Sequence, residues 1–429
     1  MASEVELWEV FRLGEAAGNV DILREAGDRL ADHWLRVSRF REVEALTTRS
    51  LRFQSSPGTL VRAGRAAEMS GNLTAALDHL QQALSNFREI SDRAGEATTL
   101  NSIGMVHAGW GDRQAALDYF EQALPIMREV RDRASEAATL TNIGLVHARW
   151  GDGSAALDHY KQALLIRREV GDRTGEGITL NNIGAVYDNW GDGPAALDHY
   201  EQALLIRREV GDRGGEAATL NNLGAVHARQ GEGAAALDYY EQALTIVRET
   251  GGRADEAVTL SNIGLVHDNR AVGVDMDPAA IAAATADRLG GAVDPDDQPG
   301  PGPPQPHRGT ETETAARKRN GCPDYYAQAL TIVREIGDRA GEAVTLNNIG
   351  LVHDNRGDGT AALDYYEQAL PIRREVGDRA GEAVTTWAVL AFMSFSTWPV
   401  TFKHHRRTAW RRCLSATIGH RHVGWRGER

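Results

Sequence analysis

The chain of 429 residues contains little lysine and little cysteine. Only Lys161, Lys318 and Lys403 are lysines, so nearly all of the 47 basic residues are arginines. Acidic residues number 60, and the net charge of −13 argues against nucleic acid as a partner for the body of the protein. The two cysteines, Cys322 and Cys413, fit neither a disulfide framework nor a zinc motif. A reducing, cytoplasmic location is therefore expected.

The usual catalytic and cofactor-binding motifs are also missing. No lysine follows a glycine, which excludes the GxxxxGK[ST] phosphate-binding loop. HExxH, GxSxG, CxxC and dinucleotide-binding glycine patterns do not stand out either. We therefore expect a protein that is not an enzyme and that has no cofactor and no metal site.

What the chain does contain is one segment repeated many times. Its clearest copy is Gly171–Val210, and equivalent residues recur forty positions apart. The leucine of the pattern, for example, is found at Leu100, Leu140, Leu180, Leu220 and Leu260. A fixed period of this length indicates a solenoid, because one helical pair cannot bury its apolar face alone.

Each copy is expected to form two amphipathic helices, at residues 174–189 and 195–210 in this copy. Gly191 suits the left-handed residue that ends the first helix, and Asp192 suits the N-cap of the second. The charged runs of the second helices, such as Glu201–Glu209, are expected to form a solvent-exposed face.

The order of apolar, small and aromatic positions within each copy resembles the tetratricopeptide repeat. In Gly171–Val210 these positions are Leu180, Ile183, Gly184, Tyr187, Gly191, Ala196, Tyr200 and Ala203. The forty-residue length is similar to the repeats of Leu-Gly-Asn spindle adaptors, kinesin light chains and bacterial signalling proteins. The resemblance implies an all-α, right-handed superhelical solenoid of about seven to eight helix pairs. It also implies that the paired helices approach closely at Gly184, with Tyr200 beside it.

The repeat pattern predicts five segments, of which one is an insert that interrupts a repeat. They are a degenerate helical N-terminal cap (1–56), a solenoid (57–270), a disordered Pro/Gly-rich insert (271–323), the continued solenoid (324–386) and a basic, Trp- and Arg-rich tail (387–429). Eight of the 13 prolines lie in the insert. The insert and the tail are either genuine additions or stretches read out of frame. The exposed half-repeats that they leave favour self-association.

The stretch 383–402 is the candidate membrane segment, because its twenty residues carry no charge and could span a bilayer. Pro399 and six serine or threonine residues make it poorly apolar. A capping helix of the solenoid, or an out-of-frame end, is therefore favoured over a membrane anchor.

A ladder of asparagines is the candidate binding site. Asparagine stands two residues before the motif glycine in most copies, and in several copies one residue earlier as well. The residues expected to bind a peptide are Asn142, Asn181, Asn182, Asn221, Asn222, Asn262, Asn347 and Asn348. In the families that this repeat resembles, the first helices line the concave face and such asparagines hold the backbone of an extended peptide. The alternative is that these side chains bond neighbouring helices and hold the superhelix together.

Charged residues lie one turn further along the first helices, at Arg149, Asp188, Arg229 and Asp268. They are expected to line the same groove and to select the side chains of the ligand, although their mixed signs favour neither an acidic nor a basic ligand. A histidine also recurs, at His107, His147, His227, His267 and His353. Adjacent helices pack about 8–10 Å apart, which places ligands one repeat apart poorly for a single metal. A packing role for these histidines is therefore expected.

The sequence thus predicts a non-catalytic scaffold that binds a peptide or partner protein in a concave groove, in bacterial signalling or regulation. Two alternatives remain open. One is a sensor-regulator that changes shape on binding a ligand and acts on a signalling ATPase in trans. The other is a frame-disrupted remnant without a partner.

Overall fold

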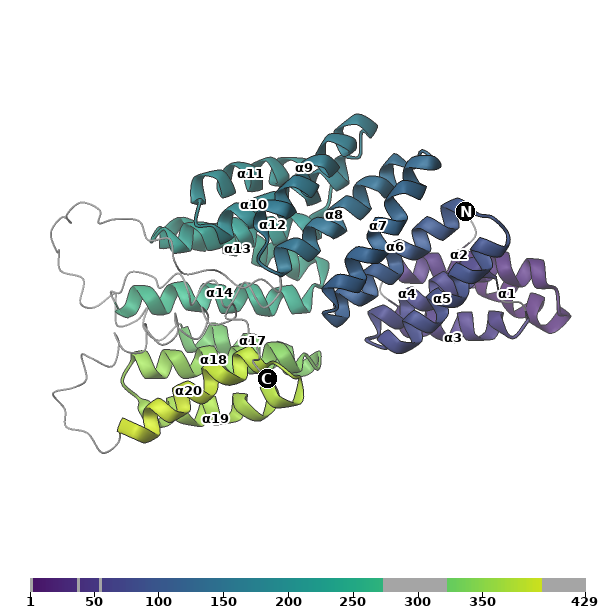
Figure 1. Cartoon of the computed structure of the whole chain (residues 1–429). Coiled ribbons are helices and arrows are strands. Elements are labelled where there is room, and N and C mark those ends of the chain that lie inside the picture. The colour runs from purple at the N-terminus through teal and green to yellow at the C-terminus, as the bar shows by residue number, and fades with distance from the viewer. Residues whose placement is uncertain (1–2, 37–38, 54–55, 273–321, 396–429) are drawn as a thin grey trace, which may run out of the picture. The chain divides into compact units, whose positions relative to one another are not determined.

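The computed structural model describes residues 3–36, 39–53, 56–272 and 322–395. Within these residues the chain forms 18 α-helices and no strand (Figure 1). The helices belong to two compact units, which divide at residues 149–151 and 175–176. The predicted all-α fold built from repeated helix pairs is confirmed.

The first unit begins at the N-terminus, where each helix packs against the next from α1 to α7. Its helices are α1 (Glu4–Ala17), α2 (Val20–Arg36), α3 (Phe40–Leu51), α4 (Pro57–Met69), α5 (Leu73–Glu89), α6 (Arg93–Trp110), α7 (Arg113–Glu129), α8 (Arg133–Arg149) and α9 (Gly153–Val170). Phe11, Leu30 and Trp34 are buried together with Val43 and form the core of the first three helices. The segment expected to be a helical cap therefore has a packed core of its own.

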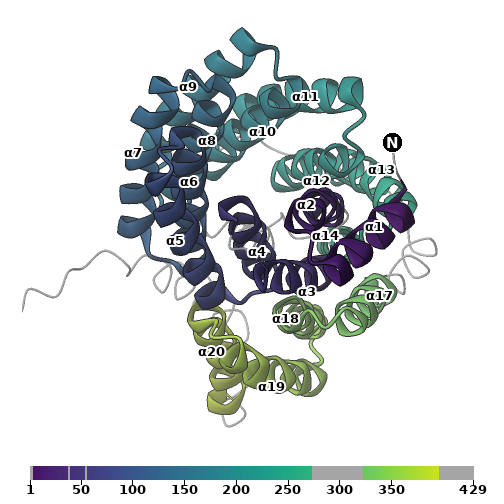
Figure 2. The same ribbon diagram turned by 90° about the vertical axis from the view of Figure 1, so that its right-hand side faces the viewer.

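The second unit contains the remaining helices. They are α10 (Arg173–Asn189), α11 (Gly193–Val210), α12 (Arg213–Arg229), α13 (Gly233–Thr250), α14 (Arg253–Val272), α17 (Cys322–Glu335), α18 (Arg339–Asn355), α19 (Gly359–Glu375) and α20 (Arg379–Phe395). Residues 273–321 of the predicted insert, and residues 396–429 of the predicted tail, lie outside the described residues. Figures 1 and 2 both show α18, α19 and α20 as consecutive neighbours.

Helix α17 packs against α14, so the repeat that the insert interrupts is complete. A Cβ atom on Gly264 would lie 2.9 Å from Cε2 of Tyr326, and the rings of His267 and Tyr325 stack with centroids 5.4 Å apart. The same contacts join the two helices of other repeats. The expectation of an exposed half-repeat at the insert is therefore wrong, because α17 occupies the second-helix position despite the intervening residues.

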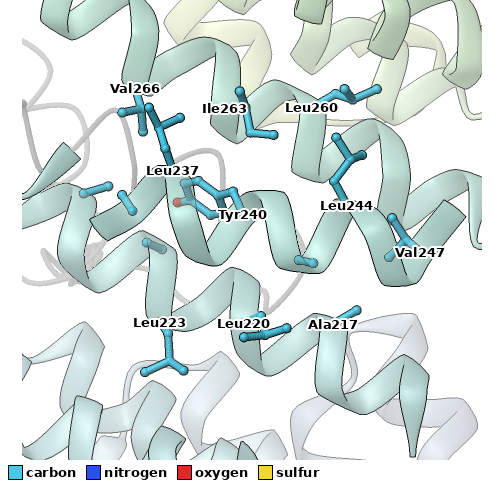
Figure 3. Packing of buried hydrophobic residues seen from close by; sticks show 14 of the residues in the cluster. Ala217, Leu220, Leu223, Leu237, Tyr240, Leu244, Val247, Leu260, Ile263 and Val266 are labelled. Atoms are coloured by element: carbon cyan, nitrogen blue, oxygen red, sulfur yellow. The ribbon is translucent and has the colours of Figure 1, made fainter. Parts of the chain in front are cut away.

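The motif glycines and aromatic residues set how closely the paired helices approach. A Cβ atom on Gly184 would lie 2.8 Å from Cδ1 of Tyr200, and one on Gly224 would lie 2.7 Å from Cε1 of Tyr240. Figure 3 shows Tyr240 among the buried leucines of this core, where it is 2% exposed. Only glycine leaves room for these rings, and close packing of this kind is what makes a change in side-chain volume costly.

The expected helix boundaries are also present. Gly191 has a φ of +77°, the left-handed conformation that glycine adopts readily. The Oδ1 atom of Asp192 accepts a hydrogen bond of 3.1 Å from the backbone N–H of Ala195, as an N-cap residue does. The helix-turn-helix unit is therefore defined by local chemistry as well as by packing.

The charged face of the second helices differs from the expectation, because its first arginine is buried. Arg167, Arg207 and Arg373 are at most 8% exposed. The Nη1 atom of Arg207 donates to the carbonyl oxygen of Gly215, and Nη1 of Arg167 donates to Asp172 over 3.1 Å. The aliphatic stems of these arginines reach the start of the following helix, and that helix covers them.

The second arginine of the same run belongs to a charged cluster that ties three helices together. Glu216 accepts hydrogen bonds from Nε of Arg208 (2.8 Å) and from Nη1 of Arg213 (2.7 Å), and Nη2 of Arg213 donates to Glu249 (2.7 Å). The cluster therefore joins α11, α12 and α13. The corresponding carboxylates that accept from two arginines are Glu96, Glu136, Glu256 and Glu342.

Candidate functional site

The predicted asparagines all lie on first helices. Asn142 is on α8, and the others are on α10, α12, α14 and α18. Their side chains are half-buried, except that Asn262 is only 9% exposed. Half-buried amides can bond both to the protein and to a ligand, since each carries two donors and an acceptor.

Several of these asparagines form hydrogen bonds between the first helices of neighbouring repeats. In the second unit, Oδ1 of Asn181 accepts from Oγ1 of Thr219 (3.2 Å) and from Nδ2 of Asn222 (3.1 Å). Nδ2 of Asn221 in turn donates to Oγ1 of Thr259 (2.9 Å). We call this set of inter-helix bonds the asparagine ladder.

The same pattern recurs in the first unit and at the end of the second. Oδ1 of Asn101 accepts from Thr139 (3.0 Å) and from Nδ2 of Asn142 (3.1 Å). Oδ1 of Asn347 accepts from Thr385 (3.1 Å). These asparagines therefore bond neighbouring helices, which is the alternative to peptide binding that the sequence left open. Their binding of a peptide stays a prediction.

The sequence reading overlooked the threonine of each first helix. Thr219, Thr259 and Thr385 are fully buried, and each bonds to an asparagine of the preceding repeat. The available signal was that threonine recurs at this position in every copy from Thr59 to Thr385, in most of them immediately before the motif leucine. A buried hydroxyl needs a partner, so a threonine at a repeated buried position points to a repeated hydrogen bond.

Two of the charged residues expected to line the groove neutralise each other. Asp188 of α10 and Arg229 of α12 form an ion pair, with side chains only 12% and 17% exposed. Burial lowers the pKa of the Arg229 guanidinium from its ordinary value. The structure places Arg149 half-buried at the matching position of α8.

Asp268 of α14 lies in the position that Asp188 has in α10, but its surroundings differ. The residue is 1% exposed, and its Oδ2 atom accepts a hydrogen bond of 3.2 Å from Nδ2 of Asn355 on α18. Burial raises the pKa of the Asp268 carboxyl, against the smaller opposing effects of Asn355 and Arg356. The guanidinium nearest to Asp268 among the described residues is that of Arg356, whose Nε lies 4.0 Å from Oδ1, so Asp268 is a buried carboxylate with a longer ion pair.

The repeated histidines stack on aromatic rings of the second helices. His227 stacks on Tyr239 with ring centroids 5.2 Å apart, and His107 stacks on Tyr119 at 5.3 Å. Tyr187, which replaces histidine in one copy, stacks in the same way on His199 at 5.4 Å. The expected packing role is confirmed. Among the described residues, no group of three or more His, Cys, Asp or Glu side chains could hold a metal ion.

The part of 383–402 that the structure describes belongs to α20. Across the described chain, none of the helices combines the length and the apolar character needed to traverse a lipid bilayer.

Helix pairs that stack through a glycine–aromatic contact, with a further set of polar bonds between first helices, define an all-helical repeat protein. The sequence profile of the tetratricopeptide repeat matches residues 56–129, 135–209, 215–270 and 324–375, which together make up more than half of the chain. The chain therefore belongs to the tetratricopeptide repeat family. No curated protein sequence matches it.

Three of the similar solved structures have TM-scores above 0.5. A signal transduction ATPase with a tetratricopeptide repeat sensor from Pyrococcus horikoshii is 13% identical, with 89% of this chain and 52% of that chain covered and a TM-score of 0.57. A Rap protein complexed with competence and sporulation factor is 13% identical, with 87% and 97% covered and a TM-score of 0.54. The apo form of RapI is 17% identical, with 75% and 99% covered and a TM-score of 0.51. At these identities the likeness concerns the fold.

Proposed function

We propose that the chain is a non-catalytic scaffold that binds an extended peptide, or an extended segment of a partner protein, on the face formed by its first helices. The observation that carries the proposal is the asparagine ladder, which repeats half-buried amide groups from one first helix to the next. Each ladder bond uses one polar group of an amide, so the amide can also offer a donor or acceptor to a peptide backbone.

The likeness to a Rap protein in complex with competence and sporulation factor supports a role in bacterial signalling. The likeness to a signalling ATPase with a repeat sensor supports the second candidate, a sensor-regulator that acts on such an ATPase in trans. A ligand that competes for ladder bonds would change the contacts between neighbouring first helices. A decrease in hydrodynamic radius on ligand binding would favour the sensor, whereas an unchanged radius would favour the rigid scaffold.

The test is a pull-down with the full chain as bait. It is repeated with a variant in which Asn142, Asn182, Asn222 and Asn262 are all changed to alanine. The matched control changes four exposed amides of the second helices, namely Gln122, Gln162, Gln242 and Gln368, to alanine. Circular dichroism must show that all three baits are equally helical.

A partner retained by the wild type and the glutamine variant but lost by the asparagine variant supports the proposal. A partner retained by all three baits would move binding away from the first helices, and no partner for any bait would favour the remnant.

A further inference from the structure

The stack between α8 and α9 differs from the other histidine stacks, because both of its rings are imidazoles. His147 and His159 stack with centroids 5.5 Å apart and planes inclined by 18°. In the other histidine stacks between a first and a second helix one ring is a tyrosine, as in His107–Tyr119, Tyr187–His199, His227–Tyr239, His267–Tyr325 and His353–Tyr365. Histidine changes its charge near neutral pH, whereas tyrosine does so at about pH 10. This helix pair therefore has two stacked rings that can both become cations in mild acid.

The ring of His147 lies between a guanidinium and a carboxylate. Its Nδ1 atom is 3.2 Å from Nη2 of Arg113 on α7 and 3.2 Å from Oδ2 of Asp152, the N-cap of α9. Nη2 of Arg113 also lies 3.6 Å from Oδ2 of Asp152. When the imidazole is neutral, Nδ1 can accept a hydrogen bond from Arg113, and when it is protonated, Nδ1 can donate to Asp152. The surroundings of His147 therefore accommodate either charge state.

His159 has no comparable partner. Its Nδ1 atom is buried and forms no hydrogen bond with a described residue. Burial and the neighbouring His147 hold the pKa of His159 below its ordinary value of 6.5, against the smaller opposing effects of Asp158, Asp152 and Glu121. With the guanidinium of α7, these carboxylates are the charged groups of α7 and α9 that act on the stack. The folded protein therefore favours the neutral form of His159.

We propose that the His147–His159 stack is a pH-sensitive contact, which holds α8 against α9 at neutral pH and loosens when mild acid protonates both rings. Two imidazolium rings at stacking distance repel each other, whereas a pair with only one charge does not. His159 binds a proton more weakly in the folded protein than in the unfolded chain. Its contribution to stability is therefore complete above about pH 6.5 and is lost as the pH falls through the folded value of the pKa. Such a device needs no ligand and acts independently of the proposed function.

Thermal midpoints of the full chain test the device. His159→Tyr should fold, because it copies the tyrosine found at this position in other repeats, such as Tyr239. Between about pH 7.5 and about pH 5.5, the midpoint of the wild type should fall by at least about 2 °C more than that of His159→Tyr. His227→Tyr removes an imidazole from a stack that has only one, so it is the matched control and should not reduce the fall. The three proteins carry the same carboxylates, and an equal fall for the wild type and His159→Tyr would overturn the proposal.

The coupling between the two rings is measured by the NMR titration of His159 in protein with ¹³C-labelled histidine. The signal of His159 is the one that His159→Tyr removes. Its titration midpoint in the wild type should lie below the ordinary value of 6.5, and His147→Tyr, which copies the Tyr187–His199 stack, should raise it. A midpoint that His147→Tyr leaves unchanged would contradict the device, because the two rings would then titrate independently.

Hydrogen exchange shows where the chain loosens. After correction for the intrinsic exchange rates, amide protection in α8 and α9 of the wild type should fall between the same two pH values by about threefold more than in α12 and α13, whose stack contains one imidazole. This excess should vanish in His159→Tyr. A uniform fall in both helix pairs would mean that acid acts on the whole array and that the stack is not the sensitive contact.

Discussion

Arg207 of α11 lies over Gly215 of α12: its Nη1 atom donates to the glycine carbonyl and would lie 2.5 Å from a Cβ atom on that glycine. Each of the buried arginines at this position faces a glycine. Gly175 faces Arg167 in the same way, whereas the unbranched Met127 is accompanied by Ser135. A glycine at the start of the next helix thus leaves room for the guanidinium of the buried arginine.

This relationship predicts the effect of a single and a double substitution. Gly215→Ser should destabilise the protein by about 1–3 kcal/mol, because the added Cβ atom would lie 2.1 Å from Oδ2 of Asp212 and 2.5 Å from Nη1 of Arg207 and would force both groups to move. Combining it with Arg207→Met, which recreates the Met127–Ser135 pair, should recover most of the loss. Thermal midpoints from circular dichroism would measure both effects. Equal midpoints for the single and the double variant would show that the arginine is not the cause.

The cluster around Glu216 predicts a loss of stability in acid. Burial raises the pKa of the Glu216 carboxyl, but the hydrogen bonds from Arg208 and Arg213 together outweigh it and leave the pKa below its ordinary value of 4.5. Glu96 and Glu256 are shifted in the same direction. A group whose pKa is lowered on folding contributes stability above its ordinary pKa, and this contribution is lost as the pH falls through the folded value.

We therefore expect the thermal midpoint of the wild type to fall as the pH drops below about 4.5. Glu216→Gln should cost about 1–3 kcal/mol at pH 7, because the arginines lose a charged acceptor, and the difference from the wild type should narrow at pH 3. The exposed Glu201→Gln is the control and should leave the midpoint unchanged. A difference that is the same at both pH values would show that the charge of Glu216 contributes nothing.

The parts of the fold that depend on residues close together in the chain could be predicted from the sequence. The motif glycine and aromatic residue, such as Gly184 and Tyr200, have the same spacing in most copies, and their contact depends only on two adjacent helices. The bond from Thr219 to Asn181 was not predictable in this way, because it depends on how closely two first helices of different repeats approach. Arg207 was misjudged because charged residues are usually solvated, whereas here the following helix covers the stem and supplies an acceptor.

The histidine stack predicts which substitutions the repeat tolerates. His227→Tyr, which copies Tyr187 of the preceding copy, should change the free energy of unfolding by less than about 1 kcal/mol, because the stacked ring is kept. His227→Ala should cost about 1–3 kcal/mol, because Tyr239 loses its neighbour. Neither midpoint should respond to zinc or to EDTA. A zinc-dependent rise in the wild type alone would instead assign the histidine to a metal.

The asparagine ladder predicts separate effects on stability and on binding. Asn181→Ala should cost about 1 kcal/mol, because Thr219 and Asn222 both lose their acceptor. Asn182 forms no ladder bond with another described residue, so Asn182→Ala should leave the midpoint nearly unchanged. If the amides also hold a peptide backbone, both variants should retain less partner than the wild type in the pull-down. Loss of partner by Asn181→Ala alone would mean that the ladder acts by holding the helices in register, and the amide of Asn182 would then have no part in recognition.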